Sequence, residues 1–246
     1  MWHKPHLLNA LADLLILIGA AALLTATAVW AVRVPSLPIQ QVIFAETLQH
    51  TRRHDIEQIL PATLKGNFFS VNLENVRGAL EQLPWVRRAT VRRVWPARLE
   101  ISIEEHKPLA RWGEARNEMV NSFGEVFTAL LPETESNALP LLAGPPGTAP
   151  EVLRRYADLV EVFQRIGERP VQLTLSSRLA WQLRLEQGMR LDLGREQPKS
   201  PIDARLKRFI EVYPEAIAKR STPPAVVDLR YPNGFAMRVA ADGKGK

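Results

Sequence analysis

Few residues in this chain have the types and spacing that catalysis or metal binding requires. His50 and His54 stand at positions i and i+4, so that on a helix their imidazoles could share a zinc ion, and Asp55 follows them. Two imidazoles without a further strong ligand make a weak site, and we favour a solvated helix end. Glu104 and Glu105 are neighbours in an expected strand, where they point to opposite faces and cannot form a catalytic carboxylate pair.

The sequence carries no motif of the common enzyme classes. It has no Gly-rich phosphate loop, no G-x-S-x-G elbow and no H-E-x-x-H pair. It also has no cysteine, which excludes disulfides, thiolate zinc sites and cysteine nucleophiles. We therefore expect a protein that is not an enzyme and that needs no cofactor, metal or small-molecule substrate.

The strongest charge signal is an arginine group made of Arg87, Arg88, Arg92, Arg93 and Arg98. The formal net charge of the chain, +6, would suit a nucleic acid or a membrane surface as partner. The next expected strand carries carboxylates that can pair with the arginines across a hairpin, namely Glu100, Glu104 and Glu105. No aromatic platform for stacking bases is interleaved with the arginines. We favour a solvated, cross-strand-paired face, with a lipid-headgroup or protein contact as the alternative and no nucleic acid.

The elements that position these residues begin with a membrane anchor. From Leu14 to Val32 about nineteen residues carry no charge, close to the roughly twenty that span a hydrocarbon core. Trp30, near the end of this run, suits the headgroup level. A cleaved signal peptide with Ala26-Thr27-Ala28 as its cleavage site is the alternative, but the apolar run is longer than the roughly 7 to 15 residues usual for such segments.

We therefore expect a cytoplasmic head (1–13), a transmembrane helix (14–33) and a short proline-containing stalk (34–39). The head is short and carries Lys4, which favours an N-terminus inside the cell and the folded part outside.

The folded part is expected to be α+β, with two domains and a disordered tail over residues 241–246. Residues 40–109 predict a compact β-α-α-β-β unit. Its elements are a strand at Gln41–Glu46, a helix from Thr51 that Pro61 ends, a helix capped by Asn72, and strands at Trp85–Val94 and Ala97–Glu105.

Residues 110–240 predict a mixed α/β domain with an antiparallel strand meander. Pro150 suits the first turn of a long amphipathic helix, and a second helix is expected from Ile202 to Tyr213. Short strands are expected at 118–122, 126–130, 171–175, 180–185, 189–193, 225–230 and 235–239.

The last two of these strands form a hairpin around Pro232-Asn233-Gly234. The final strand is expected to be a sheet edge, whose unpaired N–H and C=O groups another chain can extend. Tyr231 and Phe235 flank the turn and favour a contact surface over a protected edge, because aromatic residues dominate binding hot spots.

Short segments in a specific order carry a family resemblance. In the first domain they are Leu83-Pro84-Trp85-Val86, Arg93-Val94-Trp95-Pro96 and 99–108; in the second they are Ser177-Arg178, Trp181-Gln182-Leu183, 191–195, Arg205-Leu206 with Phe209, Tyr213-Pro214 and 227–231. With this combination the chain resembles the FtsQ family of bacterial division proteins. The first set resembles the end of that family's POTRA domain, and the second set its β domain.

The resemblance implies a divisome scaffold in the inner membrane, at the division septum, with its bulk in the periplasm and a POTRA domain that contacts other division proteins. It further implies that the β domain binds FtsB, within an FtsQ-FtsB-FtsL complex, by adding a partner strand to the last strand. The positions that match the family's FtsB-contacting surface are Arg178, Arg230, Tyr231, Asn233 and Gly234, with Phe235 and Ala236 adjoining it.

Two other classes were weighed. An anchored POTRA protein of secretion or envelope assembly would need a long β-barrel, and the sequence shows no even series of alternating strands of about ten residues. An anchored periplasmic hydrolase would need a nucleophile–base pair or a metal cluster that the sequence does not offer.

Overall fold

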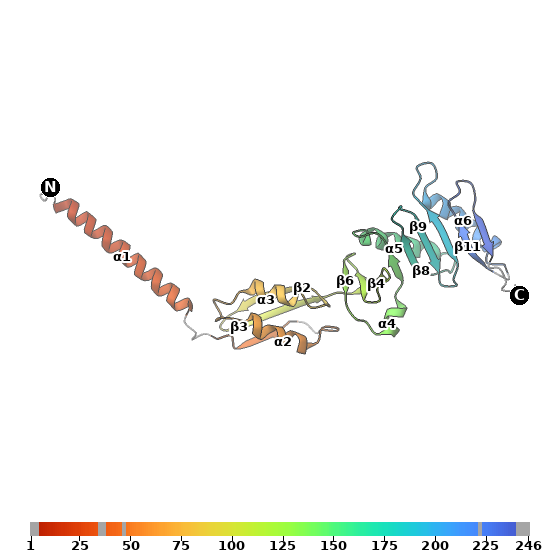
Figure 1. Ribbon diagram of the computed structural model, residues 1–246. Coiled ribbons are helices and arrows are strands. Elements are labelled where there is room, and N and C mark those ends of the chain that lie inside the picture. The colour runs from red at the N-terminus through yellow and green to blue at the C-terminus, as the bar shows by residue number, and fades with distance from the viewer. Residues whose placement is uncertain (1–4, 34–37, 46–47, 221–222, 240–246) are drawn as a thin grey trace. The chain divides into compact units, whose positions relative to one another are not determined.

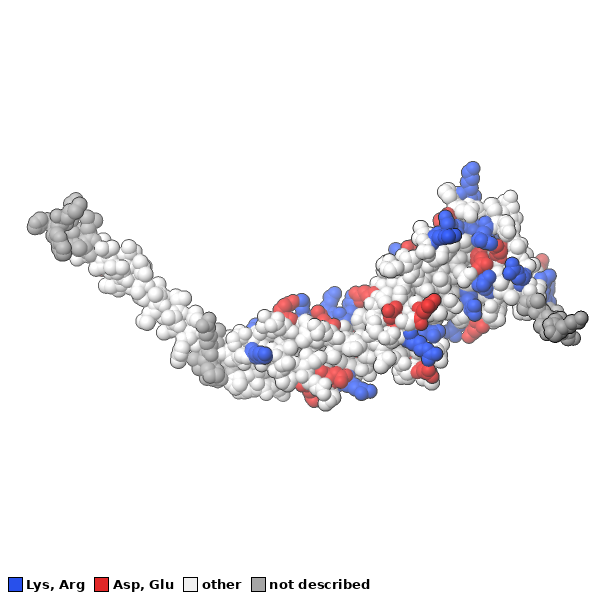
Figure 2. All heavy atoms as spheres, in the orientation of Figure 1, with Lys and Arg blue, Asp and Glu red and all other residues white. Residues whose placement is uncertain are grey.

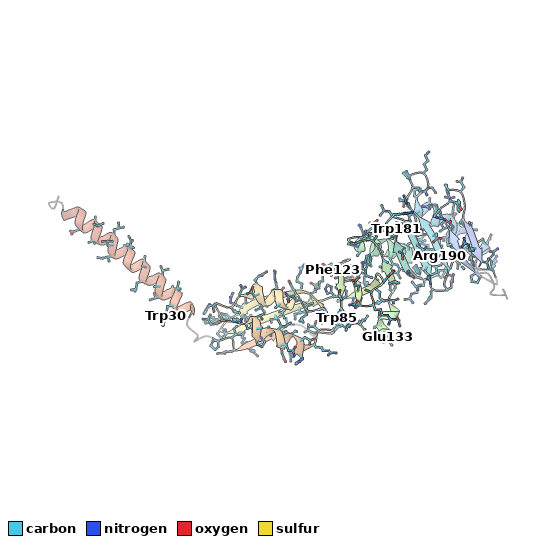
Figure 3. The ribbon with its side chains drawn as sticks, viewed as in Figure 1. Trp30, Trp85, Phe123, Glu133, Trp181 and Arg190 are labelled. Carbon is cyan, nitrogen blue, oxygen red and sulfur yellow. The ribbon has the colours of Figure 1, made fainter. Side chains whose placement is uncertain are left out.

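The N-terminal part of the chain is one long helix. The computed structural model describes residues 5–33, 38–45, 48–220 and 223–239. Its first element, α1 (Pro5–Arg33), contains a stretch, Asn9–Trp30, that is long and apolar enough to cross a membrane, as the sequence predicts. Trp30 lies at the C-terminal end of that stretch (Figure 3), and the face of α1 seen in Figure 2 shows no charged side chain.

The helix already begins at Pro5, so residues 5–13 of the expected head are helical. Residues 34–37 of the expected stalk and the expected disordered tail, 241–246, lie outside the described residues.

The chain divides into two compact units, Met1–Glu105 and His106–Lys246. After α1, the first unit contains the expected β-α-α-β-β arrangement (Figure 1). Its elements are β1 (Gln41–Phe44), α2 (Arg53–Thr63), α3 (Leu73–Leu80), β2 (Val86–Val94) and β3 (Arg98–Glu105). The sheet order is β1-β3-β2, with β1 parallel and β2 antiparallel to the central β3.

Alternation along β3 decides which face of this sheet the helices cover. Leu99, Ile101 and Ile103 are buried, and they share their core with Ile56 of α2 and Val76 of α3. The intervening residues of β3 face the other side, since successive side chains of a strand point to opposite faces. Burial of apolar side chains on one face of a sheet therefore fixes the fold of this unit.

The polar face of the same sheet carries the cross-strand pairs that the sequence predicts. Arg92 Nη2 lies 2.6 Å from Glu100 Oε1, and Arg87 Nη1 lies 2.9 Å from Glu104 Oε1. The cap is also confirmed, because the Asn72 side chain accepts hydrogen bonds from two backbone N–H groups in the first turn of α3.

The second unit is built on one mixed sheet of nine strands, in the order β12-β11-β10-β9-β8-β7-β4-β5-β6. The strands are β4 (Pro108–Trp112), β5 (Glu118–Asn121), β6 (Val126–Thr128), β7 (Leu141–Ala143), β8 (Pro170–Leu175), β9 (Trp181–Leu185), β10 (Arg190–Gly194), β11 (Pro224–Asp228) and β12 (Ala236–Val239). The helices are α4 (Glu133–Ala138), α5 (Ala149–Gln164) and α6 (Ile202–Ala216).

Helices α5 and α6 cover one face of this sheet side by side. The rings of Phe163 in α5 and Phe209 in α6 are 6.3 Å apart, and both are fully buried. In β9, Trp181, Leu183 and Leu185 point into the same core while the alternate residues are exposed. The opposite face of the sheet is left polar at these strands.

Three short elements were not expected from the sequence, namely β4, β7 and α4. Two expected helix ends are also wrong, because Pro61 and Pro214 lie inside α2 and α6 instead of following them. A proline removes only its own N–H from the ladder, and the residues after it can still turn: Leu64 N–H donates to the Leu60 carbonyl at 2.8 Å.

Candidate partner-binding edge

The C-terminal strand β12 is an edge of the nine-stranded sheet, as the sequence predicts. It pairs with β11 alone, in an antiparallel hairpin that places Val227 opposite Met237 and Asp228 opposite Ala236. All four residues of β12 are exposed, whereas β9 buries every second residue. The strand therefore buries neither face, and the side of its main chain away from β11 has no neighbouring strand among the described ones.

The turn between β11 and β12 is held at both ends by buried contacts. Leu229 is 1% exposed, and its N–H donates to the Asp192 carbonyl at 2.9 Å. Phe235 meets the ring of Phe209 edge-on, with 5.7 Å between the centroids. Between these two contacts the chain from Arg230 to Gly234 is exposed, and this outward-facing loop holds four of the expected contact residues: Arg230, Tyr231, Asn233 and Gly234.

Arg230 is held in place by its neighbour Asp228. Its Nε and Nη2 donate to the two carboxylate oxygens at 2.8 and 2.6 Å, and its backbone N–H donates to Oδ1 at 3.0 Å. The side-chain hydrogen bonds from Arg230 lower the pKa of the Asp228 carboxyl, against the smaller opposing effect of burial. The same bonds raise the pKa of Arg230, which keeps its charge at every physiological pH.

A buried arginine, Arg205, holds this turn by hydrogen bonds to backbone carbonyls. Sequence reasoning did not predict this role. Arg205 of α6 is 3% exposed, and its guanidinium donates to three backbone carbonyls: Leu193 at 2.6 Å, Arg195 at 2.7 Å and Leu229 at 2.9 Å. It joins the end of β10 to the residue before Arg230. The sequence feature that could have revealed Arg205 is its position on the apolar face of α6, beside Ile202, Leu206 and Phe209.

Arg178 lies at the same end of the sheet but outside this cluster. It sits in the β8–β9 turn, beside Leu179, whose φ is 58° and whose side chain is 61% exposed. Strand β10 runs antiparallel to β9 and parallel to β11, so the β8–β9 and β11–β12 turns share one end of the sheet. Two to three strand spacings, roughly 10 to 14 Å, separate them. A single partner segment could span both turns.

Four of the residues that suggested chemistry have structural partners. The His50 ring stacks on Trp85 at 4.1 Å, and His54 contacts Gln58. Glu105 accepts hydrogen bonds from backbone N–H groups at residues 49–51, whereas Glu104 faces away to Arg87. Within the described residues, no group of three His, Cys, Asp or Glu side chains could hold a metal ion.

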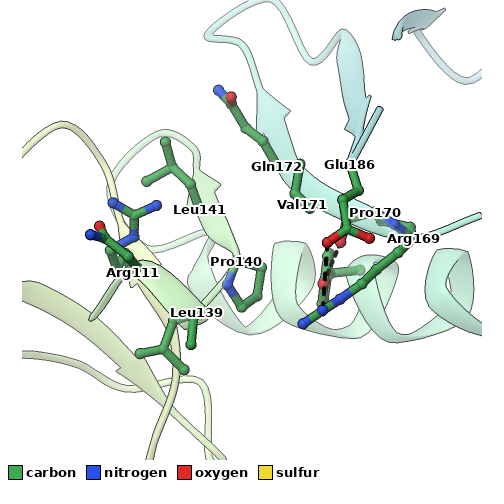
Figure 4. A pocket seen from close by; sticks show the side chains of 12 residues that line it. Arg111, Leu139, Pro140, Leu141, Arg169, Pro170, Val171, Gln172 and Glu186 are labelled. Carbon is green, nitrogen blue, oxygen red and sulfur yellow. Dashed lines mark hydrogen bonds and ion pairs between the residues drawn. The ribbon is translucent and has the colours of Figure 1, made fainter. Parts of the chain in front are cut away.

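The second unit also has a hollow of about 330 Å³, lined by the starts of β7 and β8 and by α5 (Figure 4). Inside it Arg169 and Glu186 form an ion pair at 3.8 Å, and the Tyr156 hydroxyl donates to the Pro170 carbonyl at 2.9 Å. This hollow lies at the end of the sheet opposite the β11–β12 turn, since Pro170 pairs with Leu185 there. No nucleophile–base pair is assembled among the residues that line it.

A helix long and apolar enough to cross a membrane, followed by a β-α-α-β-β unit and a sheet with an open C-terminal edge, fits the class of single-pass membrane proteins. Comparison with family models agrees. Residues 37–106 match the "POTRA domain, FtsQ-type" and residues 110–230 match "Cell division protein FtsQ/DivIB, C-terminal".

Whole-chain relatives give the same result. The chain is 38% identical to the cell division protein FtsQ of Burkholderia pseudomallei over 240 residues, which cover 98% of this chain and 95% of the relative. It is 36% identical to FtsQ of Bordetella pertussis over 98% of this chain and 93% of the relative, and 30% identical to FtsQ of Neisseria gonorrhoeae over 99% and 97%. The chain belongs to the FtsQ family of cell division proteins.

Proposed function

We propose that this chain is a non-catalytic scaffold of the division machinery at the septum, anchored in the inner membrane with its N-terminus in the cytoplasm and both folded units in the periplasm. The second unit binds FtsB, within a complex that contains FtsL, by accepting a partner strand on β12. The folded part of the first unit, which matches the POTRA model over residues 37–106 and which we term the POTRA unit, contacts other division proteins. The protein acts through these contacts and needs no cofactor or small-molecule substrate.

The full exposure of β12 is the observation that carries this proposal. A strand that pairs on one side only presents N–H and C=O groups on the other, and another chain can continue the sheet there. Exposed edges of this kind are normally blunted by charge, proline or a covering segment. β12 carries one charged residue, Arg238, and no proline. The exposed loop beside it offers Arg230 and Tyr231 as side-chain anchors.

Binding is tested first. The full-length chain in detergent micelles is titrated by calorimetry with the periplasmic segment of FtsB, beside Tyr231→Ala. Tyr231 is 53% exposed, so its truncation should leave the fold intact while weakening binding by about 30-fold, as expected for a hot-spot residue. Phe123→Ala is the matched control, because Phe123 is 58% exposed in the turn between β5 and β6, at the other edge of the same sheet. No binding by the unaltered chain would reject the FtsB assignment.

Strand addition is tested separately by cross-linking. The chain has no cysteine, so Met237→Cys provides a single thiol on β12. FtsB segments that carry one cysteine each are then oxidised with it. Because side chains alternate along a paired strand, a partner strand on β12 should cross-link at every second position. Cross-linking without alternation would show that the partner binds in another conformation.

A further inference from the structure

The POTRA unit has an apolar, basic tip at the end where the chain enters from α1. Gln41, the first residue of β1, lies opposite Arg98, the first residue of β3, and the Gln40 N–H donates to the Ala97 carbonyl at 2.9 Å. The β2–β3 hairpin turn therefore stands next to the start of β1. Glu105, where β3 ends and the second unit begins, is at the other end of the sheet.

A loop after α2 joins this hairpin turn through Arg93. The Arg93 guanidinium donates to the carbonyls of Phe68, Phe69 and Val71 at 2.7, 3.2 and 2.7 Å. The Phe68 ring meets Trp95 edge-on at 6.2 Å. Three segments, 38–41, 64–71 and 92–98, thus form one surface, which we term the hairpin tip.

The hairpin tip exposes large aromatic side chains together with positive charge. Trp95 is 70% exposed and Phe69 is 43% exposed. The three segments carry four basic residues and no acidic one; the basic residues are Lys65, Arg92, Arg93 and Arg98. Within the part of the chain that the structure describes, Arg92 alone of these four forms an ion pair, and its partner Glu100 lies outside the tip.

The chain tethers this surface close to the bilayer. Seven residues separate Arg33, the end of α1, from Gln41, the start of β1, and seven residues extend to at most about 25 Å. Exposed tryptophan beside basic residues is the composition that favours the headgroup region, where indoles partition and anionic lipids attract Lys and Arg. Proximity and charge favour the lipid surface over a protein partner.

We propose that the hairpin tip docks on the anionic lipid surface of the membrane that α1 spans, with Trp95 and Phe69 at the headgroup level and Lys65 and Arg98 facing lipid phosphates. This inference rests on α1 spanning the membrane and is independent of FtsB binding. Docking would fix the orientation of the POTRA unit on the bilayer, so that the opposite end of its sheet, at Glu105, points away from the membrane.

The test uses the absence of cysteine to place one fluorescent label. Full-length chain carrying Phe69→Cys or Trp95→Cys is labelled with NBD and reconstituted into phosphatidylcholine vesicles with or without phosphatidylglycerol, and quenching by shallow doxyl lipids is measured. The control is Gln82→Cys, an exposed position at the far end of the sheet, roughly 23 Å away along β3. We expect quenching at residues 69 and 95 that increases with phosphatidylglycerol, and none at residue 82.

Several outcomes would overturn the proposal. They are no quenching at either tip label, equal quenching at residue 82, or a blue shift of the NBD emission without lipid quenching, which would indicate a protein contact. In the chain labelled at residue 69, reversal of two charges by Lys65→Glu with Arg98→Glu should abolish the phosphatidylglycerol dependence while Trp95 stays in place. The same double variant should bind FtsB normally. A negative result for lipid docking is therefore distinguishable from a negative result for FtsB binding.

Discussion

The side chain of Arg230 lies directly against the backbone of Gly194. A Cβ at Gly194 would come within 2.7 Å of Arg230 Cγ, and Gly194 has a φ of +74°, which side-chain-bearing residues rarely adopt. The β9–β10 pairing shifts register between Asp192 and Gly194, so the glycine also ends regular pairing there. Gly194 thus provides the space in which the stem of Arg230 is packed.

Gly194→Ala tests this relationship. The new methyl group would meet the Arg230 stem, and the left-handed backbone would be strained, so we expect a loss of about 1–3 kcal/mol in the free energy of unfolding. FtsB affinity should fall as well, because Arg230 is displaced. Urea unfolding and calorimetry measure the two effects. Gly188→Ala is the control, since its φ of +92° gives similar strain with nothing within 4 Å of the new Cβ. Equal FtsB affinity in both variants would contradict the packing role.

The Asp228–Arg230 pair predicts a pH dependence. Its hydrogen bonds lower the folded-state pKa of Asp228, so the pair stabilises the fold above the unfolded-state pKa of an aspartate, and this contribution is lost as the pH falls through the lowered value. Arg230→Gln should raise the pKa of Asp228, measured by NMR titration of its carboxyl carbon. The variant should lose only about 0.5–1 kcal/mol at neutral pH, because Arg230 is largely exposed. An unchanged pKa would show that the pair does not persist in solution.

Local patterns in the sequence were sufficient to predict much of this fold. Alternation along β3, the Asn72 cap and the Pro232-Asn233-Gly234 turn each act within a few residues of their own position, and each is confirmed. The edge position of β12 was also predictable, because the last strand of a meander has a neighbour on one side only.

Features that depend on contacts between distant segments were not predictable. Strand β7 has three residues and exists because β4 and β8 flank it in parallel, a pairing that leaves no local signature. The support of Arg230 by Gly194 and Arg205 joins three separate segments, and Arg205 lies in a helix whose pattern favours an apolar residue. Sequence reasoning predicted contact residues in the exposed β11–β12 turn and missed the buried residues that hold this turn in place.

Arg205→Met should show how strongly this buried support matters. Methionine keeps much of the volume but leaves the carbonyls of Leu193, Arg195 and Leu229 without their donor, so we expect a loss of about 2–4 kcal/mol in stability. Hydrogen exchange at Leu229 and Arg230 should accelerate more than exchange in β5. Arg208→Met is the matched control, because Arg208 is half-buried on the same helix, whereas Arg205 is buried, and its Nε donates to the Ala204 carbonyl within that helix. Similar effects in the two variants would contradict the role given to Arg205.

In the POTRA unit, Glu105 organises the loop that precedes α2. Its carboxylate accepts from the N–H groups of Gln49 at 2.8 Å, His50 at 3.1 Å and Thr51 at 2.6 Å. Burial of the carboxyl raises its pKa, but the hydrogen bonds from Thr51, Gln49 and His50 together outweigh burial and leave the pKa below its ordinary value. The folded state therefore favours the ionised form.

Glu105→Gln removes this charge while keeping the shape of the side chain. We expect a loss of about 1–2 kcal/mol at neutral pH, since charge-assisted hydrogen bonds are stronger than neutral ones and partial exposure reduces the difference. The advantage of the unaltered chain should be complete above the unfolded-state pKa of a glutamate and should vanish as the pH falls through the lowered folded-state value. Hydrogen exchange of the amide protons at residues 49–51, followed against pH, measures this stabilising contribution of Glu105. Glu104→Gln, which loses one exposed ion pair, should change those protons little. A stability difference that is constant from neutral to acid pH would show that the charge of Glu105 is not what orders the loop.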